Sequence, residues 1–281
     1  MAVEALERLQ LKVLKAAVPL VMAPANYRDD TVQFAMTVAA IRSLSDTVRR
    51  FTFAAPEFGR FTPSGPDEYF ALIFQARPDQ DLVLPDAGRI NVRTGVAQIP
   101  EAQRPEMRWY TVRALRPEAG EIDVDIVLHG DAGPGSRWAL RAEPGDRVGF
   151  RAYGSSYRPT VTDGPRLFVA DETAMPALYS VLESLTATDG VTALLELPDA
   201  SYDTPLAAAI TPEIVLRGSG APGSAALARL AELDLPKLGY AWACGETSLA
   251  SGVRRHLVKN GLADRRSIMF SGYWKLGTVR V

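Results

Sequence analysis

Residues 104–117, RPEMRWYTVRALRP, bring together side chains that could bind a flat, anionic ligand. In an extended strand Arg108 and Tyr110 point to one face, while Trp109 and Thr111 point to the other. A guanidinium fork suits a phosphate, and a tyrosine ring can lie flat against an aromatic ring system. Thr111, at the edge of the strand, could offer its hydroxyl to the rim of that ring. The alternative is a cross-strand ladder of arginine and aromatic side chains on a solvent-exposed face.

A glycine-containing loop follows one hairpin later, within HGDAGPGSRWALRAEPGD, residues 129–146. Gly133 and Gly135 flank a turn, and Ser136 is predicted to cap a short helix over RWALRAE. Free backbone N–H groups at such a helix start suit a phosphate or diphosphate, although the loop could equally be an ordinary connection between strands. His129 could make either a structural hydrogen bond or a ligand contact. The loop and the strand together favour a bound nucleotide that carries a flat ring.

Two strand–helix junctions in the second half of the chain could also bind a ligand. FVADETAMPAL ends a strand at Asp171-Glu172 and begins a helix at Thr173, and WACGETSLASGVRRHL does the same with Gly245-Glu246 and Thr247. In open α/β sheets ligands bind at the carboxyl ends of the strands. Neither GxGxxG nor GxxxxGK[ST] is present, so ordinary N-capping of two helices is the stronger local interpretation.

The segment FSGYWKLG places aromatic surface and a cation near the carboxyl terminus. Trp274 and Lys275 could be a core residue and a lysine that reaches solvent. They could also form a platform over a flat cofactor, and the sequence leaves both interpretations open.

The elements that must position these residues differ between the two halves. The first 30 or so residues are mostly helical and lead into a loop, and short alternating segments then recur to about residue 155, as in an antiparallel barrel or sandwich. In EIDVDIVLHG, for example, Ile122 and Val124 share the apolar face. Apolar runs that alternate with helices follow, which predicts a parallel sheet. We therefore expect a two-domain protein of β and α/β class, with residues 1–160 forming the first domain and residues 161–281 the second.

The composition narrows the possible partners. The chain has 281 residues, a net charge of −2 and a pI near 5.8, which argues against a nucleic-acid partner or a polybasic membrane contact. Its single cysteine, Cys244, excludes an internal disulfide, and the amino terminus resembles neither a signal peptide nor a membrane span. We expect a cytoplasmic monomer. With one cysteine and two distant histidines, His129 and His256, no protein-held zinc or iron site is expected.

Taken in order, these motifs resemble the siderophore-interacting protein family of flavin-dependent ferric-siderophore reductases. RWYTVR resembles the R-x-Y-T-x-R strand of that family, and VDIVLHGDAGPGSRWALRAEPGD resembles its V-D-x-x-x-H-G…G-P-x-S-x-W-A…P-G-D segment. ADETAMPAL, WACGETSLASGVRRHL and GYWKLG follow in the expected order. The resemblance implies an antiparallel flavin-binding β-barrel followed by an NAD(P)-binding α/β domain, similar to the ferredoxin reductase superfamily. In place of the family's GYWR this chain has GYWK, which keeps the cation and loses the bidentate fork.

The resemblance also implies roles for individual residues. Tyr110 would pack on the isoalloxazine and Thr111 would reach its edge, so these two are the expected catalytic residues, with Val112 beside them. The FAD diphosphate and neighbouring groups would be held by Arg108, His129, Gly133, Ser136, Trp138 and Ala139. The nicotinamide nucleotide would lie near Asp171, Glu172, Thr173, Gly245, Glu246, Thr247 and Trp274. Arg137 and Lys275 are candidates for a basic lining that binds the siderophore.

The implied activity is transfer of electrons from NADPH or NADH, through the flavin, to a ferric siderophore. One added electron weakens the hold of catecholate or hydroxamate oxygens on iron, so reduction releases Fe(II) without iron ligands from the protein. One alternative is another ferredoxin reductase-like protein that exchanges electrons with a protein partner such as ferredoxin. A built-in 2Fe–2S domain is excluded because it would need four cysteines. A second alternative is a flavin- or siderophore-binding carrier without turnover.

Overall fold

The structure is a computed structural model that describes residues 18–129, 133–158 and 164–278. These residues form two compact units: residues 26–155 make the first, and residues 18–25 join residues from 156 onward in the second. The predicted boundary near residue 160 and most of the predicted amino-terminal helix lie outside the described residues.

The first unit is an antiparallel β-barrel. Its sheet runs in the order β5-β4-β8-β2-β3-β7-β6, with β1 paired to β8. The strands are β1 (Asn26–Tyr27), β2 (Gln33–Ser43), β3 (Val48–Ala54), β4 (Glu68–Phe74), β5 (Glu106–Thr111), β6 (Ala114–Arg116), β7 (Glu121–Val127) and β8 (Arg147–Ser155). The segment between β5 and β6 connects the two edges of the sheet. Its Val112 N–H donates to the carbonyl of Glu68 in β4 at 2.7 Å, and its Arg113 N–H donates to the carbonyl of Asp123 in β7 at 2.8 Å.

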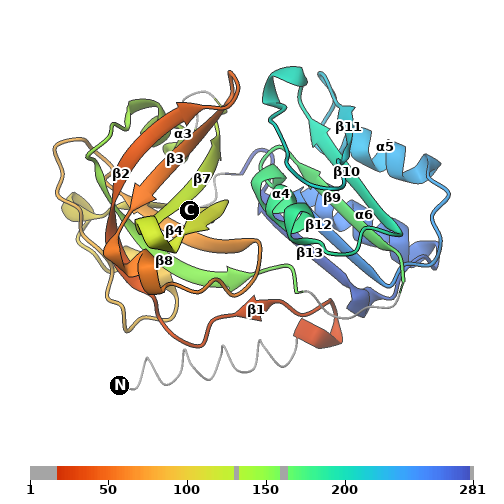
Figure 1. Cartoon of the computed structure of the whole chain (residues 1–281), viewed down its shortest axis with the longest axis horizontal. Helices are drawn as coiled ribbons and strands as arrows, with labels where there is room; N and C mark the ends of the chain where they lie inside the picture. The colour runs from red at the N-terminus through yellow and green to blue at the C-terminus, as the bar shows by residue number, and fades with distance from the viewer. Residues whose placement is uncertain (1–17, 130–132, 159–163, 279–281) are drawn as a thin grey trace. The chain divides into compact units, whose positions relative to one another are not determined.

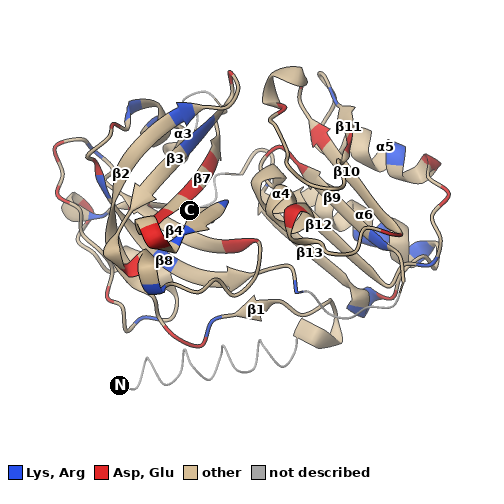
Figure 2. Ribbon diagram, viewed as in Figure 1, with Lys and Arg blue, Asp and Glu red and all other residues tan. Residues whose placement is uncertain are grey.

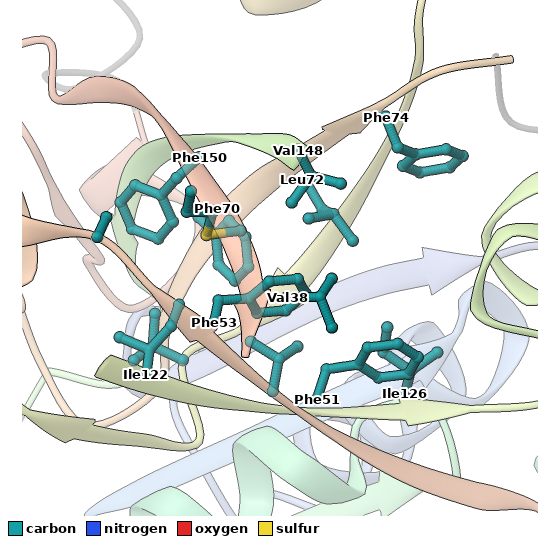
Figure 3. Close-up of a cluster of buried hydrophobic side chains, with 14 of the residues drawn as sticks. Val38, Phe51, Phe53, Phe70, Leu72, Phe74, Ile122, Ile126, Val148 and Phe150 are labelled. Carbon is teal, nitrogen blue, oxygen red and sulfur yellow. The ribbon is translucent and has the colours of Figure 1, made fainter. Parts of the chain in front are cut away.

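Alternation along the strands fills the barrel with apolar side chains. Figure 3 shows aromatic and aliphatic residues of several strands converging, among them Phe51, Phe70 and Ile122, which are fully buried. On the opposite face of β7, Asp125 lies 2.6 Å from the Arg50 guanidinium and 3.7 Å from Arg113. The predicted alternation of β7 is thus confirmed, and Arg113 belongs to the ion pairs that hold the barrel wall.

Two short α-helices accompany the barrel, α2 (Val92–Ala97) and α3 (Pro134–Arg141). Helix α3 connects β7 to β8 and inserts Trp138 into the core, where its ring lies 5.2 Å from that of Phe51 and 5.4 Å from that of Phe74. The side chain therefore fixes α3 to the barrel.

The second unit is a parallel five-stranded sheet in the order β11-β10-β9-β12-β13. Helices α5 and α6 pack on one face and α4 lies on the other (Figure 1). The elements are β9 (Arg166–Asp171), α4 (Met175–Ser184), β10 (Val191–Leu197), β11 (Glu213–Leu216), α5 (Ser224–Glu232), β12 (Tyr240–Glu246), α6 (Thr247–Lys259) and β13 (Ile268–Trp274). The direction of the strand order reverses between β9 and β12, and ligands of such sheets bind beside this point, at the carboxyl ends of the strands.

Short 3₁₀ segments complete the described chain: η1 (Val18–Leu20), η2 (Pro56–Arg60), η3 (Glu101–Gln103), η4 (Pro117–Ala119), η5 (Ala200–Tyr202) and η6 (Arg265–Ser267). None of the helices in the described ranges combines the length and apolar character needed to cross a membrane. The predicted fold class, an antiparallel barrel followed by a parallel α/β unit, is confirmed.

Candidate functional site

In the first unit, strand β5 and the start of α3 lie in direct contact. A Cβ atom added to Gly135 would overlap the Tyr110 hydroxyl and would lie 3.4 Å from Cγ of Arg108. Only glycine allows the first turn of α3 to approach β5 this closely. The fold therefore brings together the arginine, the tyrosine and the glycine loop that the sequence singles out.

Helix α3 begins differently from the prediction. Gly133 is the N-cap residue, with an extended backbone, and Pro134 is the first helical residue, where proline is favoured because it lacks an N–H group. The prediction that Ser136 caps the helix is wrong. Its Oγ lies inside the first turn and accepts a hydrogen bond from the His129 N–H at 3.2 Å, which closes the loop at its base.

The first turn of α3 is suited to bind an anion. Among the described residues no side chain caps it, so its N–H groups are not taken up by a cap. The turn presents the positive end of the helix dipole beside Arg108. His129 is exposed, and it contacts Ser136 through its backbone N–H.

Arg108 keeps part of its guanidinium accessible. A quarter of its side chain is exposed, Nη1 donates to the Met107 carbonyl at 2.6 Å, and the same atom lies 3.5 Å from a Glu106 oxygen. Burial raises the pKa of Tyr110 above its ordinary value, so its phenol stays neutral. Arg108 can thus supply positive charge, and Tyr110 a neutral aromatic surface, on the same face of β5.

The neighbouring predicted residues mainly hold this arrangement in place. Thr111 and Val112 are buried, with exposed fractions of 7% and 5%. Ala139 is buried and its carbonyl accepts a hydrogen bond from Arg49 at 3.1 Å. Because the Trp138 ring lies in the core, only the backbone of Trp138 is open to a ligand. Arg137, also on α3, is exposed.

In the second unit, the buried carboxylate of Asp171 connects three elements at the carboxyl edge of the sheet. Its Oδ1 accepts from the Thr173 N–H at 2.9 Å and from the Thr173 hydroxyl at 2.6 Å. Its Oδ2 accepts from the Glu246 N–H at 2.6 Å and from the Trp274 indole N–H at 2.8 Å. Burial, followed by the nearby Glu172, raises the pKa of Asp171 to about 6.

Gly245 and Thr247 complete this junction. A Cβ at Gly245, whose φ is +136°, would lie 2.5 Å from Cγ of Asp171, so the close packing of the two strands requires glycine there. The Thr247 hydroxyl donates to the Trp274 carbonyl at 2.8 Å. Lys275 follows and is exposed. The structure therefore assembles the predicted nucleotide-side residues at the ends of β9, β12 and β13.

At the start of two helices in this unit, buried carboxylates accept hydrogen bonds from backbone N–H groups. Glu246 Oε2 accepts from the Ser248 and Leu249 N–H groups at the start of α6. Glu196, at the end of β10, accepts from the Gly223 N–H at 2.6 Å and the Ala226 N–H at 2.9 Å at the start of α5. For Glu246 this confirms the N-capping interpretation.

Sequence reasoning missed Glu196 and its neighbour Arg217. The Arg217 guanidinium binds Glu172 in a bidentate pair at 2.7 and 2.9 Å and lies 3.5 Å from Glu196. A carboxylate near the end of the apolar run ALLEL was the one local signal for Glu196. No local signal pairs Arg217 with a residue 45 positions away.

Two family models together match most of the chain. Residues 37–156 match the siderophore-interacting FAD-binding domain, and residues 165–277 match the siderophore-interacting protein model. The chain belongs to the siderophore-interacting protein family. A Mycobacterium tuberculosis protein is 30% identical over 261 residues, which cover 86% of this chain and 90% of that protein.

Other proteins resemble this chain over most of its length. The NADPH-dependent ferric-chelate reductase of Escherichia coli is 28% identical, covering 89% of this chain and 96% of that protein. The crystal structure of a siderophore utilization protein from T. fusca has a TM-score of 0.74 at 28% identity, covering 91% of this chain and 97% of that one. A ferredoxin reductase in carbazole 1,9a-dioxygenase, at 14% identity and a TM-score of 0.61, shares the fold over 87% of this chain and 70% of its own.

Proposed function

We propose that this protein is an FAD-dependent reductase that transfers electrons from NAD(P)H to a ferric siderophore and releases the iron as Fe(II). The observation that carries the proposal is the contact of Gly135 with Tyr110 and Arg108. This contact sets a helix start without a side-chain cap beside a cation and a neutral aromatic ring, within a match to an FAD-binding domain. Relatives named ferric vibriobactin reductase and ferric acinetobactin reductase support the substrate class.

The residues present fit FAD. A dinucleotide needs positive charge and N–H donors for its diphosphate and a flat apolar surface for its ring. Arg108 and the first turn of α3, from Gly133 to Ser136, would hold the diphosphate. Tyr110 would cover the ring and Thr111 would lie at its edge, with Val112 fixing the strand through its bond to Glu68. Trp138 and Ala139 would anchor the helix and contribute through their backbone, and His129 would lie at the base of the loop.

When bound, FAD accepts a hydride from a nicotinamide and can release electrons one at a time. The protein itself has to bind and orient the donor and the acceptor. In the second unit Asp171, Thr173, Gly245, Thr247, Trp274 and the backbone of Glu246 would position the nicotinamide nucleotide. Arg137 and Lys275 would attract an anionic siderophore, since exposed positive charge raises the local concentration of anions.

The chain provides no competing iron site where the structure describes it. No group of three or more His, Cys, Asp or Glu residues there is arranged to hold a metal ion. Iron would be a substrate that arrives bound to the siderophore and is released as Fe(II). One NAD(P)H carries two electrons, enough to reduce two ferric ions to Fe(II).

A reduced protein such as ferredoxin is the alternative electron donor, and the carboxylates at the starts of α5 and α6 favour it because they oppose a nucleotide diphosphate. We also propose that the protein acts as a monomer in the cytoplasm. Size-exclusion chromatography with light scattering tests the oligomeric state.

The experiment that tests the function is anaerobic reduction of the purified full chain. The protein should be yellow, should bleach at 450 nm with NADH or NADPH, and should recover its colour when a ferric siderophore is added with an Fe(II) trap. A protein that neither retains nor rebinds FAD contradicts the proposal. A yellow protein that bleaches with dithionite and never with either nucleotide favours a protein donor or the carrier alternative.

A further inference from the structure

The carboxyl ends of β10 and β11 have a charge pattern that bears on which nicotinamide nucleotide the second unit accepts. In nucleotide-binding sheets of this type, an acidic residue after the second strand binds the ribose 2′-hydroxyl of NAD, whereas an arginine accommodates the 2′-phosphate of NADP. The second strand here is β10, which ends at Leu197. Asp199 follows two residues later and is exposed.

No cation competes with Asp199 along this part of the chain. Residues 167–216 contain neither lysine nor arginine. Figure 2 accordingly shows β10 and α4 without blue segments. A 2′-phosphate placed here would find no positive charge before residue 217.

Arg217, the first cation after this stretch, is already paired. Its guanidinium is held at 2.7 and 2.9 Å by Glu172, lies 3.5 Å from Glu196, and its side chain is only 10% exposed. Its N–H donates to the Leu197 carbonyl at 3.0 Å, so the end of β11 lies directly beside the end of β10. Because two carboxylates surround this one guanidinium, Arg217 leaves the edge acidic.

Asp199 is held as an anion that can accept a hydrogen bond. Its Oδ1 accepts from the Ser201 N–H at 2.8 Å, and the Ser201 contacts lower the pKa of this exposed carboxyl. Nearby Tyr202 has its pKa raised by burial and then by the charges of Glu172 and Asp199. Arg217 lowers the pKa of both groups, so the carboxylates, Tyr202 and Arg217 share one electrostatic environment.

We propose that Asp199, together with the Glu172–Arg217 pair, makes this protein select NADH over NADPH. The inference rests on the proposed use of a nicotinamide nucleotide and goes further than it. A ribose 2′-hydroxyl can donate to Asp199, whereas a 2′-phosphate would add about two negative charges beside it. The selectivity would differ from that of the Escherichia coli relative, whose name specifies NADPH.

The test compares binding and reduction with both nucleotides on the full chain. Calorimetry with NAD⁺ and NADP⁺ gives affinities that do not depend on flavin turnover, and anaerobic stopped-flow with NADH and NADPH gives the reduction rates. We expect NADH to be preferred roughly 10- to 100-fold in both, a range that one polar substituent can supply. Equal use of the two nucleotides, or preference for NADPH, overturns the inference and leaves the proposed function intact.

Three substitutions distinguish a charge effect local to Asp199 from an effect of the overall charge of the protein. Two are at Asp199, after the carboxyl end of β10, and one is at Asp189, before its amino end. Asp199→Arg should reduce the preference at least about 10-fold, mainly by strengthening NADP⁺ binding. Asp199→Asn keeps an oxygen that can accept from the Ser201 N–H, and it should reduce the preference for NADH severalfold. This variant keeps the test valid if the arginine variant fails to fold. Asp189→Arg, at an exposed residue before the amino end of β10, should change the preference by less than about twofold. Equal effects of the substitutions at positions 189 and 199 overturn the assignment.

Failure of the nucleotide step is also distinguishable. If neither NAD⁺ nor NADP⁺ binds, and dithionite-reduced protein is still reoxidised by ferric siderophore, the inference is overturned while siderophore reduction stands. If the protein binds NAD⁺ selectively but never retains FAD, the inference is supported and the proposed function fails.

Discussion

The helix of the first unit that follows the glycine loop begins in the opposite way from two helices of the second unit. Helix α3 starts at Gly133-Pro134 with no side-chain cap among the described residues and with Arg108 nearby. Helices α5 and α6 start beneath the buried carboxylates of Glu196 and Glu246. A cap of this kind stabilises a helix by about 1 kcal/mol, and here it also places negative charge where a diphosphate would otherwise bind.

The turn before α4 is also held by a carboxylate, although α4 itself begins at Met175, not at the predicted Thr173, and has no side-chain cap. Asp171 accepts the N–H groups of Thr173 and Ala174, and the first turn of α4 is buried. One unit therefore has a helix start suited to a permanently held dinucleotide. The other uses carboxylates to stabilise the starts of α5 and α6, which suits a nucleotide that binds weakly and leaves after each hydride transfer.

The largest effect is expected from filling the gap between α3 and β5. Gly135→Ala would drive its methyl group into the Tyr110 hydroxyl, and overpacking of this kind costs about 1–3 kcal/mol. We expect FAD affinity to fall by up to about 100-fold, measured by flavin content and by titration of the apoprotein. Gly59→Ala is the matched control, because its methyl group would meet the nearest atom at an ordinary 3.6 Å. Unchanged FAD affinity in Gly135→Ala would contradict the proposed site.

The buried carboxylate of Asp171 should make the stability of the protein depend on pH. Its pKa of about 6 lies above the ordinary value of 3.8, so the folded state holds a proton that the unfolded state has lost. The stabilisation is complete below about pH 4 and is lost as the pH rises through 6, by roughly 2–3 kcal/mol. Urea unfolding at pH 4.5 and pH 7 should show this loss relative to Asp171→Asn. Parallel pH dependences of the two proteins would show that Asp171 is ionised throughout.

Removing the cation beside α3 should have an intermediate effect. Arg108→Ala should weaken FAD binding about 10-fold, since a hydrogen bond to a charged group contributes about 1.5–3 kcal/mol. The loss should shrink at high salt, and Arg108→Lys should recover part of it. Arg104→Ala removes an exposed arginine that donates to the Ile99 and Ala97 carbonyls. If this control loses as much FAD, the effect is not specific to Arg108.

The smallest effect is expected at the start of α6. Glu246→Gln keeps an oxygen that can accept the Ser248 and Leu249 N–H groups and removes the negative charge. The KM for the preferred nucleotide should fall about threefold, as expected for a charge interaction of less than 1 kcal/mol. A rise in KM would mean that the carboxylate binds the nucleotide rather than repelling it.

Sequence patterns predicted the fold better than the geometry of the candidate site. Period-2 alternation along β7 and the later apolar runs predicted both units, because burial of one face dictates those patterns. The contact of Gly135 with Tyr110 could not be predicted, since it depends on how α3 packs against β5. Ser136 was predicted as the cap because serine favours that position, but Pro134 starts the helix earlier. Trp138 is predicted as a cofactor contact, and no sequence pattern indicated that its ring also fills the barrel core.

The most direct measurement is calorimetric titration of the flavin-free full chain with FAD and, separately, with NAD⁺. Both ligands contain an ADP moiety, so the comparison reports how each unit treats a diphosphate. We predict a Kd below about 1 µM for FAD and above about 100 µM for NAD⁺, a difference of at least about 2.7 kcal/mol. Equal affinities, or tighter binding of NAD⁺ than of FAD, would contradict it.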